Sequence, residues 1–260
     1  DPRTPVHRGQ GCLDARPLGE LFLDDGVAYL RPGPFYNVEV PEELENPADF
    51  ITFVDSAFEM FLSARARALI VDLRNNPGGD SSFSDPLVAW FAHRPFCFAS
   101  SFRIRSSEAA EASNRARLER TGGGGISETY AKRFAATPHG EVFELELPNT
   151  KPRTRRFPGP VFVLIDRASY SNAVSTAALV QDYGFATVAG EATADLATTY
   201  GAMEHFALPV TGLRVGFPKA HIIRPNGDPR PAGVVPDLPL SGPPDQVLEA
   251  LRHKAIEAVE

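Results

Sequence analysis

Two short apolar runs, at 68–73 and 161–165, most constrain how this chain can fold. Neither run alternates with polar residues over its first four positions, which is typical of a strand buried on both faces of a parallel sheet. A shorter strand is predicted at 186–190. Helices are predicted at 42–66 and 171–183, where apolar residues recur at helical spacing. This alternation of strands and helices predicts an α/β fold with a layered core of mainly parallel strands.

Further elements are predicted outside this core. They are strands at 26–32, 96–105 and 142–147, helices at 85–93 and 244–259, and strands at 203–209 and 213–223 that form a strand-rich C-terminal extension. We interpret residues 24–260 as one domain. Residues 1–23 form an N-terminal extension that begins with a polar stretch, lacks an initiator Met and does not have the pattern of a signal peptide, so we interpret it as a processed or truncated start.

The segment 107–135 differs from the rest of the chain. A highly charged helix is predicted at 108–120, and Thr121 and four consecutive glycines, Gly122 to Gly125, follow it. We expect this segment to contribute little to a hydrophobic core. It is predicted to be a mobile excursion that serves as a cap or as a linker between two lobes.

The composition excludes several classes of function. The net charge is −7 and there is no block rich in Lys and Arg, which argues against a nucleic-acid partner. No apolar run approaches the roughly 20 residues of a membrane-spanning helix. Cys12 and Cys97 are either two separate buried thiols or, in an exported protein, a disulfide. Neither cysteine has the His neighbours of a metal site, so no metal is predicted.

Two turns follow the buried strands directly, and ligand sites collect at the carboxyl ends of such strands. The first turn, 75–80, contains Gly78 and Gly79, whose N–H groups can approach an oxyanion without a Cβ in the way. The second turn, 167–173, contains Ser169 and Ser171 where a strand meets a helix. Taken singly, the first is explained by a strand-ending turn and the second by a helix N-cap. Together they supply a hydroxyl and N–H donors, the minimal set for acyl transfer.

Three motifs in order resemble those of the tail-specific (C-terminal-processing) serine peptidases. The first is the strand and turn Asp72-Leu73-Arg74-Asn75-Asn76-Pro77-Gly78-Gly79. The second is the stretch 161–193, which ends in Gly190-Glu191-Ala192-Thr193, and the third is Gly233-Val234-Val235-Pro236-Asp237. The resemblance covers roughly residues 24–240. It implies a crotonase/Clp-protease-like core, and an exported protein of the bacterial envelope.

The resemblance also implies an activity and a site. The chain would be a serine endopeptidase that acts on unfolded or C-terminal polypeptide segments through an acyl-enzyme, without a metal or organic cofactor. Ser171 is the implied nucleophile, because choosing Ser169 places the Gly190-Glu191 pair two residues out of register. The implied oxyanion hole consists of Gly78 or Gly79 and the N–H of Asn172.

The general base stays unassigned. Relatives of the Ser-Lys branch carry a lysine where this chain has Leu196, flanked by Asp195 and Ala197, so the resemblance is closer to the tricorn-like branch. That branch uses a glutamate near Arg230-Pro231-Ala232 and a histidine in an Asp-x-His-Thr setting, and neither is present; His7 does not match. The other candidates are predicted to be surface, packing or loop residues: His93, His139, His205, Lys219 and His221. Asp72 and Arg74 are expected to form an ion pair or to brace the turn.

Three explanations for the base remain open. The first places it in a segment that precedes this chain, and the second makes it an unrecognised residue within the chain. In the third, the protein is a degenerate relative that binds peptides, or an apolar ligand, without cutting. A binding module is therefore the second functional hypothesis. Acyl-CoA chemistry on the related crotonase fold is a third, but the sequence has no basic cluster for the cofactor's phosphates. The sequence leaves the oligomeric state open.

Overall fold

The computed structural model describes residues 19–40 and 43–260. These residues divide into two compact units. The first, which we call the core unit, contains the described residues up to Phe98 together with Asn149–Ala197 and Pro231–Glu260. The second, which we call the insert unit, contains Ala99–Pro148 and Thr198–Arg230. Each unit has its own sheet.

The core unit is built on a six-stranded sheet in the order β1-β2-β3-β6-β7-β10. Its first two strands are antiparallel, and every later neighbouring pair is parallel. The strands are β1 (Glu20–Asp24), β2 (Val27–Arg31), β3 (Ala68–Asp72), β6 (Val161–Ile165), β7 (Thr187–Gly190) and β10 (Leu238–Pro239). All residues of β3 and β6 are buried, as their unbroken apolar runs predicted.

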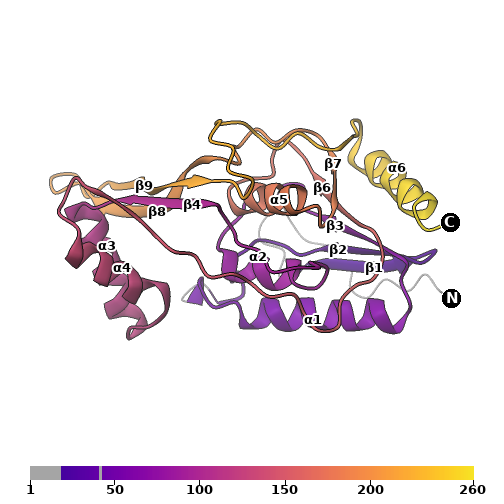
Figure 1. Ribbon diagram of the computed structural model, residues 1–260, viewed down its shortest axis with the longest axis horizontal. Coiled ribbons are helices and arrows are strands. Elements are labelled where there is room, and N and C mark those ends of the chain that lie inside the picture. Colours follow the sequence, from indigo (N-terminus) through magenta and orange to yellow (C-terminus); the bar gives the residue numbers. More distant parts are fainter. Residues whose placement is uncertain (1–18, 41–42) are drawn as a thin grey trace. The chain divides into compact units, whose positions relative to one another are not determined.

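Helices cover both faces of this sheet (Figure 1). One face packs against α1 (Ala48–Ser63), α2 (Ser81–Val88) and α5 (Asn172–Tyr183), and the other against α6 (Pro244–Glu257). The side chains of β3 alternate accordingly: Leu69 and Val71 belong to the first cluster, and Ala68 and Ile70 to the second. The core unit is therefore a three-layer α/β structure, as predicted.

The insert unit has a four-stranded antiparallel sheet in the order β5-β4-β9-β8. Its elements are β4 (Ser101–Arg105), α3 (Glu108–Thr121), α4 (Gly125–Ala136), β5 (Val142–Glu144), β8 (Thr199–Ala207) and β9 (Arg214–Ile223). The segment 107–135 was expected to contribute little to a core, yet α4 buries two aromatic side chains in this unit. Tyr130 and Phe134, one turn apart on α4, are buried, and the Phe134 ring meets that of Phe143 edge-on at 5.5 Å between centroids.

A buried ionic cluster supports the insert unit. The Glu204 carboxylate accepts hydrogen bonds from Arg117 (2.6 Å), from the Ser113 hydroxyl (2.5 Å) and from Lys219 (2.5 Å). The Lys219 ammonium also lies 4.2 Å from the centre of the Tyr130 ring. The expectation that Lys219 is a solvated strand residue is therefore wrong, because this charge is buried with its partners.

Several predicted boundaries also change. The strand β1 was not predicted; it pairs with β2 and lies at the end of the stretch interpreted as an extension. The helix predicted at 85–93 instead begins at Ser81, because the Asp80 carboxylate accepts a hydrogen bond from the Ser82 N–H and caps it. The helix over 171–183 ends as expected at Gly184, which is left-handed (φ 68°).

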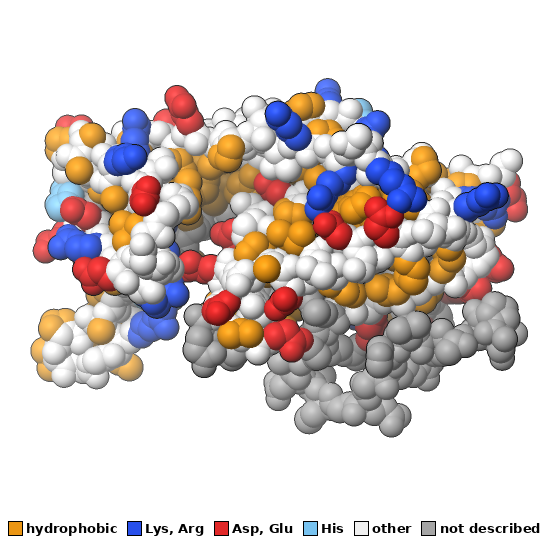
Figure 2. Space-filling model, turned by 90° about the horizontal axis from the view of Figure 1, so that it is seen from below, with side chains coloured by type: hydrophobic (Ala, Val, Ile, Leu, Met, Phe, Trp, Pro, Cys, Tyr) orange, Lys and Arg blue, Asp and Glu red, His pale blue; other side chains and the backbone are white. Residues whose placement is uncertain are grey.

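The surface carries charges of both signs. On the face shown in Figure 2, the described basic and acidic side chains are interspersed. Two of the ion pairs join α1 to the segment before β6: Asp55 with Arg153, and Glu59 with Arg155. Among the described helices, none combines the length and the apolar character needed to cross a membrane.

Candidate active site

Three turns meet at one edge of the core sheet. Because β3, β6 and β7 are parallel neighbours, the segments that follow them leave the sheet at the same edge. These segments are the glycine turn (73–80), the serine turn (166–171) and the segment 191–197, which we call the third turn. This is the position where open α/β sheets bind ligands.

Ser171 occupies a strained position in the serine turn. Its backbone has φ 51° and ψ −120°, which non-glycine residues rarely adopt. Although Ser171 is at the N-cap position of α5, its side chain makes no capping bond and its hydroxyl has no hydrogen-bond partner among the described residues. Ser171 is exposed. A strained strand-to-helix turn that presents a free hydroxyl is the arrangement of a nucleophile elbow.

The hydroxyl of Ser169 is engaged instead. It is fully buried, donates a hydrogen bond to the Leu73 carbonyl (2.8 Å) and accepts one from the Asp166 N–H (3.1 Å). These bonds join the serine turn to the glycine turn. Of the two serines, only Ser171 therefore has a hydroxyl available for chemistry.

The glycine turn lies directly against the serine turn. A Cβ on Gly78 would fall 2.6 Å from the Asn172 nitrogen and 2.8 Å from the Ser171 Cβ, closer than such atoms come in proteins. A Cβ on Gly79 would fall 1.9 Å from the Phe35 oxygen. Both residues also have positive φ, 80° and 139°. Close approach and backbone conformation thus require glycine at both positions.

The backbone N–H groups of the site differ in their partners. The Gly78 N–H donates to the Asn76 side-chain oxygen at 2.8 Å. The N–H groups of Gly79 and Asn172 donate to no acceptor in the part of the chain that the structure describes. Asn172 is the first residue of α5, where N–H groups have no acceptor within the helix. Gly79 and Asn172 are therefore the donors left over for a ligand.

The base of the glycine turn is braced by the expected ion pair. The Arg74 guanidinium contacts the buried Asp72 carboxylate at 2.7 Å, and the Tyr29 hydroxyl donates to the same carboxylate at 2.8 Å. Burial, and then the Asp72 charge, raise the pKa of the Tyr29 hydroxyl. Asp72 and Arg74 thus shape the turn rather than reach its open side.

The third turn is fixed by the two remaining motifs. The Thr193 N–H donates to the Val234 carbonyl (3.1 Å), and the Val234 N–H donates to the Thr193 hydroxyl (2.9 Å). A Cβ on Gly233 would fall 2.3 Å from the Thr193 carbonyl oxygen, so the segments that contain these two residues are in direct contact. Asp237 accepts a hydrogen bond from the Val188 N–H at 2.8 Å and ties the last motif to β7. Glu191 is exposed.

Asp195, on the third turn, makes a contact that the sequence analysis missed. Its carboxylate accepts a hydrogen bond from the Ser171 N–H at 2.6 Å. Asp195 is adjacent to Leu196, the position at which Ser-Lys relatives carry their lysine. The only available signal was this adjacency, since no periodicity links residues 24 positions apart.

The side-chain amide of Asn172 is buried. The Asn172 side-chain nitrogen donates to the Ser84 hydroxyl at 2.9 Å, and its side-chain oxygen is buried without a partner among the described residues. The neighbouring Asp85 accepts a hydrogen bond from Thr150 at 2.9 Å. Burial raises the pKa of Asp85 to about 6. Ser84 and Asp85 are on α2, which follows the glycine turn.

No histidine or lysine is hydrogen-bonded to Ser171 within the described residues. In the core unit, the His93 ring packs against Phe185 and His253 lies 3.3 Å from Glu249. In the insert unit, His139 lies 3.1 Å from Glu111, the His221 ring lies 4.8 Å from that of Tyr200, and His205 is exposed. His7 and Cys12 lie outside the described residues, so the role of His7 and a bond between Cys12 and Cys97 stay open.

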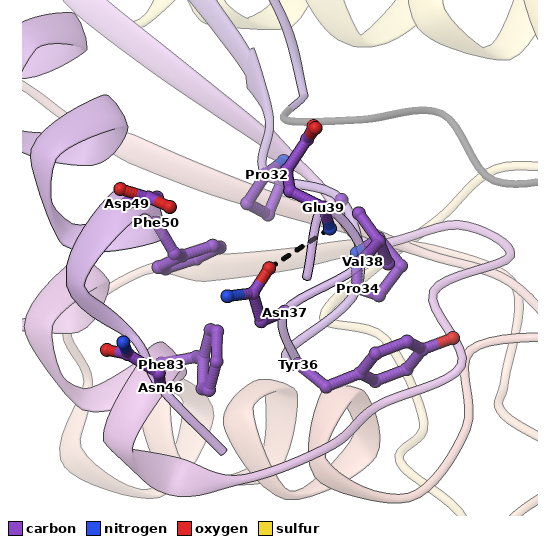
Figure 3. Close-up of a pocket in the computed structure, with 11 residues that line it drawn as sticks. Pro32, Pro34, Tyr36, Asn37, Val38, Glu39, Asn46, Asp49, Phe50 and Phe83 are labelled. Carbon is purple, nitrogen blue, oxygen red and sulfur yellow. Dashed lines mark hydrogen bonds between the residues drawn. The ribbon is translucent and has the colours of Figure 1, made fainter. Parts of the chain in front are cut away.

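A small cavity of about 20 Å³ lies beside the loop that supports the glycine turn (Figure 3). The Phe35 N–H in this loop donates to the Gly78 carbonyl at 2.9 Å, and Asn76 donates to the Gly33 carbonyl at 2.7 Å. Asn37 points into the space between the rings labelled in Figure 3, with its oxygen held by the Glu39 N–H at 3.0 Å. The cavity has room for about one water molecule and is too small for a substrate side chain.

Residues 42–240 match the model of peptidase family S41. No curated protein sequence matches the chain.

Several solved structures share the fold. They include a mutant of CPAF (TM-score 0.63, 16% identity, 98% of this chain and 55% of that one), the photosystem II D1 C-terminal processing protease (0.51, 18%, 84% and 45%) and a lipoprotein from Streptococcus agalactiae (0.55, 15%, 95% and 72%). The chain thus spans about half the length of the first two. The predicted crotonase/Clp-protease-like α/β core with mainly parallel strands is confirmed.

Proposed function

Because this chain belongs to peptidase family S41, as its motifs predicted, we propose that it is a serine endopeptidase that cuts unfolded or C-terminal polypeptide segments. The observation that carries the proposal is the Ser171 hydroxyl on a strained turn, next to the N–H of Asn172; neither group has a hydrogen-bond partner among the described residues. No metal or organic cofactor takes part. The polypeptide is both substrate and partner.

Each group has a defined part in the proposed reaction. The Ser171 oxygen attacks the substrate carbonyl carbon, and the serine proton passes to a general base. The N–H groups of Asn172 and Gly79 stabilise the oxyanion of the tetrahedral intermediate. The intermediate then expels the amine, which takes the proton from the base, and leaves an acyl-enzyme. Water, deprotonated by the same base, attacks the acyl-enzyme carbonyl. The bond to the Ser171 oxygen then breaks, and the base returns its proton to that oxygen.

Gly78 has a different part from the one implied by the resemblance. Its N–H is already held by Asn76, so Gly79 is the better donor of the pair. Gly78 instead allows the glycine turn to touch the serine turn, since any side chain there would strike Ser171 and Asn172. We assign the general base to no residue.

A fluorophosphonate probe, which reacts with activated serines, tests the proposal. We expect one adduct on the wild-type protein, mapped to Ser171 by mass spectrometry. Ser171→Ala should lose the adduct, whereas Ser175→Ala, one turn further along α5, is the matched control and should keep it. Absence of an adduct from the natural full-length protein would refute the peptidase proposal.

One observation favours the alternative of a peptide-binding module without catalysis. The Ser171 hydroxyl has no base bonded to it in the described residues. For such a module, unfolded polypeptides would bind with the same affinity to the wild type and to Ser171→Ala, and neither protein would cleave them. Calorimetric titration combined with a cleavage assay separates the two functions.

We further propose that the protein is exported, as the family resemblance implies. Fractionation of the source cells, with detection by an antibody to this chain, tests this. Recovery only from the cytoplasm would contradict the proposal.

A further inference from the structure

The backbone of Ser171 is strained. Its φ of 51° combined with a ψ of −120° lies outside the small left-handed helical region that other residues visit. A residue stays in so unfavourable a conformation only when its surroundings fix it on both sides. The contacts of the two peptide groups that flank Ser171 show what fixes it.

The peptide group after Ser171 is held by α5. Its carbonyl accepts hydrogen bonds from the Val174 N–H (2.9 Å) and the Ser175 N–H (3.1 Å). The peptide group before Ser171 is held at both ends. The Tyr170 carbonyl accepts from the Ala173 N–H (3.0 Å), and the Ser171 N–H donates to the Asp195 carboxylate (2.6 Å). A bond to an ionised acceptor is stronger than one between neutral groups.

Asp195 is itself held in place. Its carbonyl accepts a hydrogen bond from the Thr193 hydroxyl at 2.8 Å, and Thr193 is locked to Val234. On the other side, the Ala197 N–H donates to the Ala232 carbonyl at 2.9 Å. The third turn is therefore anchored on both sides of Asp195, so the carboxylate can act as a fixed support.

We propose that Asp195 is the positioning residue of the nucleophile. By accepting the Ser171 N–H, it keeps Ser171 in the conformation that frees the hydroxyl and directs the Asn172 N–H away from any protein acceptor. The inference rests on the proposed function only where turnover or labelling is the readout. The alternative is that Asp195 supplies a negative charge at the N-terminus of α5, with no control over Ser171.

Labelling kinetics with the fluorophosphonate probe test the positioning directly. We expect Asp195→Ala to lower the maximal labelling rate by roughly 10- to 100-fold and to leave the half-saturating probe concentration unchanged, because a misplaced nucleophile costs rate rather than binding. Asp195→Asn keeps an oxygen acceptor and should recover most of the rate. Asp245→Ala, an exposed carboxylate on α6, is the matched control and should label like the wild type.

A second measurement does not depend on activity. Replacing Ser171 by Gly relieves the strain, whereas Ala retains it, so the two variants should differ in their denaturation midpoints. In the Asp195→Ala background the turn can relax, and this difference should shrink. If the wild type is not labelled at all, the proposed function fails while this comparison still tests the positioning role.

Either of two results would overturn the inference. One is an unchanged labelling rate in Asp195→Ala together with an unchanged Gly–Ala difference. The other is an Asp195→Asn variant as slow as Asp195→Ala at equal stability, which would show that the charge matters and the hydrogen bond does not.

Discussion

Replacing Gly78 by Ala should disrupt the contact between the glycine turn and the serine turn. A new Cβ would lie 2.5 Å from the Tyr170 oxygen, 2.6 Å from the Asn172 nitrogen and 2.8 Å from the Ser171 Cβ. Two of these are backbone atoms, which cannot move aside as the end of a flexible side chain can. The variant therefore tests whether the two turns form one site.

The expected cost has two parts. The positive φ of 80° costs a residue with a Cβ about 1–2 kcal/mol. Forcing atoms into a filled space costs about 1–3 kcal/mol more. Gly78→Ala should thus reduce the free energy of unfolding by about 2–5 kcal/mol, a large part of the stability of an ordinary domain.

Gly184→Ala is the matched control. Gly184 has a similar φ of 68°, but a Cβ there would meet nothing within 4 Å. This variant should therefore lose only the backbone part, about 1–2 kcal/mol. The difference in unfolding free energy between the two variants therefore measures the cost of the steric contact at Gly78 alone.

Urea denaturation followed by Trp fluorescence provides the assay. Trp90 is the only tryptophan in the sequence, is buried in the core unit and stacks on Phe58 with 5.1 Å between ring centroids. Its signal therefore reports unfolding of the unit that contains the site. If Gly78→Ala lowers the midpoint no more than Gly184→Ala, with equal slopes, the two turns do not touch and the site as described is wrong.

Three further variants probe other groups of the protein. Ser171→Gly should be more stable than Ser171→Ala by about 1 kcal/mol or more in the same urea assay, because only glycine adopts the observed conformation without strain; equal midpoints would contradict this. Glu204→Gln should destabilise the insert unit by about 3–5 kcal/mol, because the positive charges of Lys219 and Arg117 lose their negative partner. Faster amide hydrogen exchange in β8 and β9 would report this destabilisation. Burial raises the pKa of Asp85 to about 6, so the folded protein favours the protonated carboxyl. The stability that this proton provides is fully present below about pH 4 and is lost as the pH rises through 6. Asp85→Asn should remove this loss of at most about 3 kcal/mol, so the variant should be more stable than the wild type at pH 8. If the difference in unfolding free energy between the two proteins does not change between pH 5 and pH 8, the assignment is refuted.

The parts of the fold that were predicted from the sequence are those in which neighbouring residues show a recognisable burial pattern. Strands β3 and β6 are buried on both faces, so their apolar runs are unbroken and were easily recognised. The turns after them were found because glycine and serine are conspicuous where a strand ends. The Asp72–Arg74 pair was expected for the same reason, since its members are two residues apart.

The parts that were missed depend on partners distant in sequence. The charged helix α3 gives no sign that its Arg117 will pair with Glu204, a strand residue more than 80 positions later. Nor does it show that Glu204 will also bury the charge of Lys219. Likewise, the adjacency of Asp195 to Leu196 marks the position but does not show that the Asp195 carboxylate reaches the Ser171 N–H, 24 residues earlier. A single sequence shows which residues are unusual at a position, whereas the partner of a buried polar group is set by the folded chain.

The three motifs specify backbone geometry more than side-chain chemistry. Gly78, Gly190 and Gly233 occupy places where a Cβ would lie within 3 Å of another segment, and Thr193 and Asp237 bind backbone groups. Of the residues proposed to meet a substrate, only Ser171 does so through its side chain; the others offer N–H groups. None of the bracing contacts in the described core unit involves a histidine or a lysine that could serve as the base. The turns can therefore hold their shape whichever residue supplies the base, which is why the motifs lead to a proposed nucleophile and leave the base unassigned.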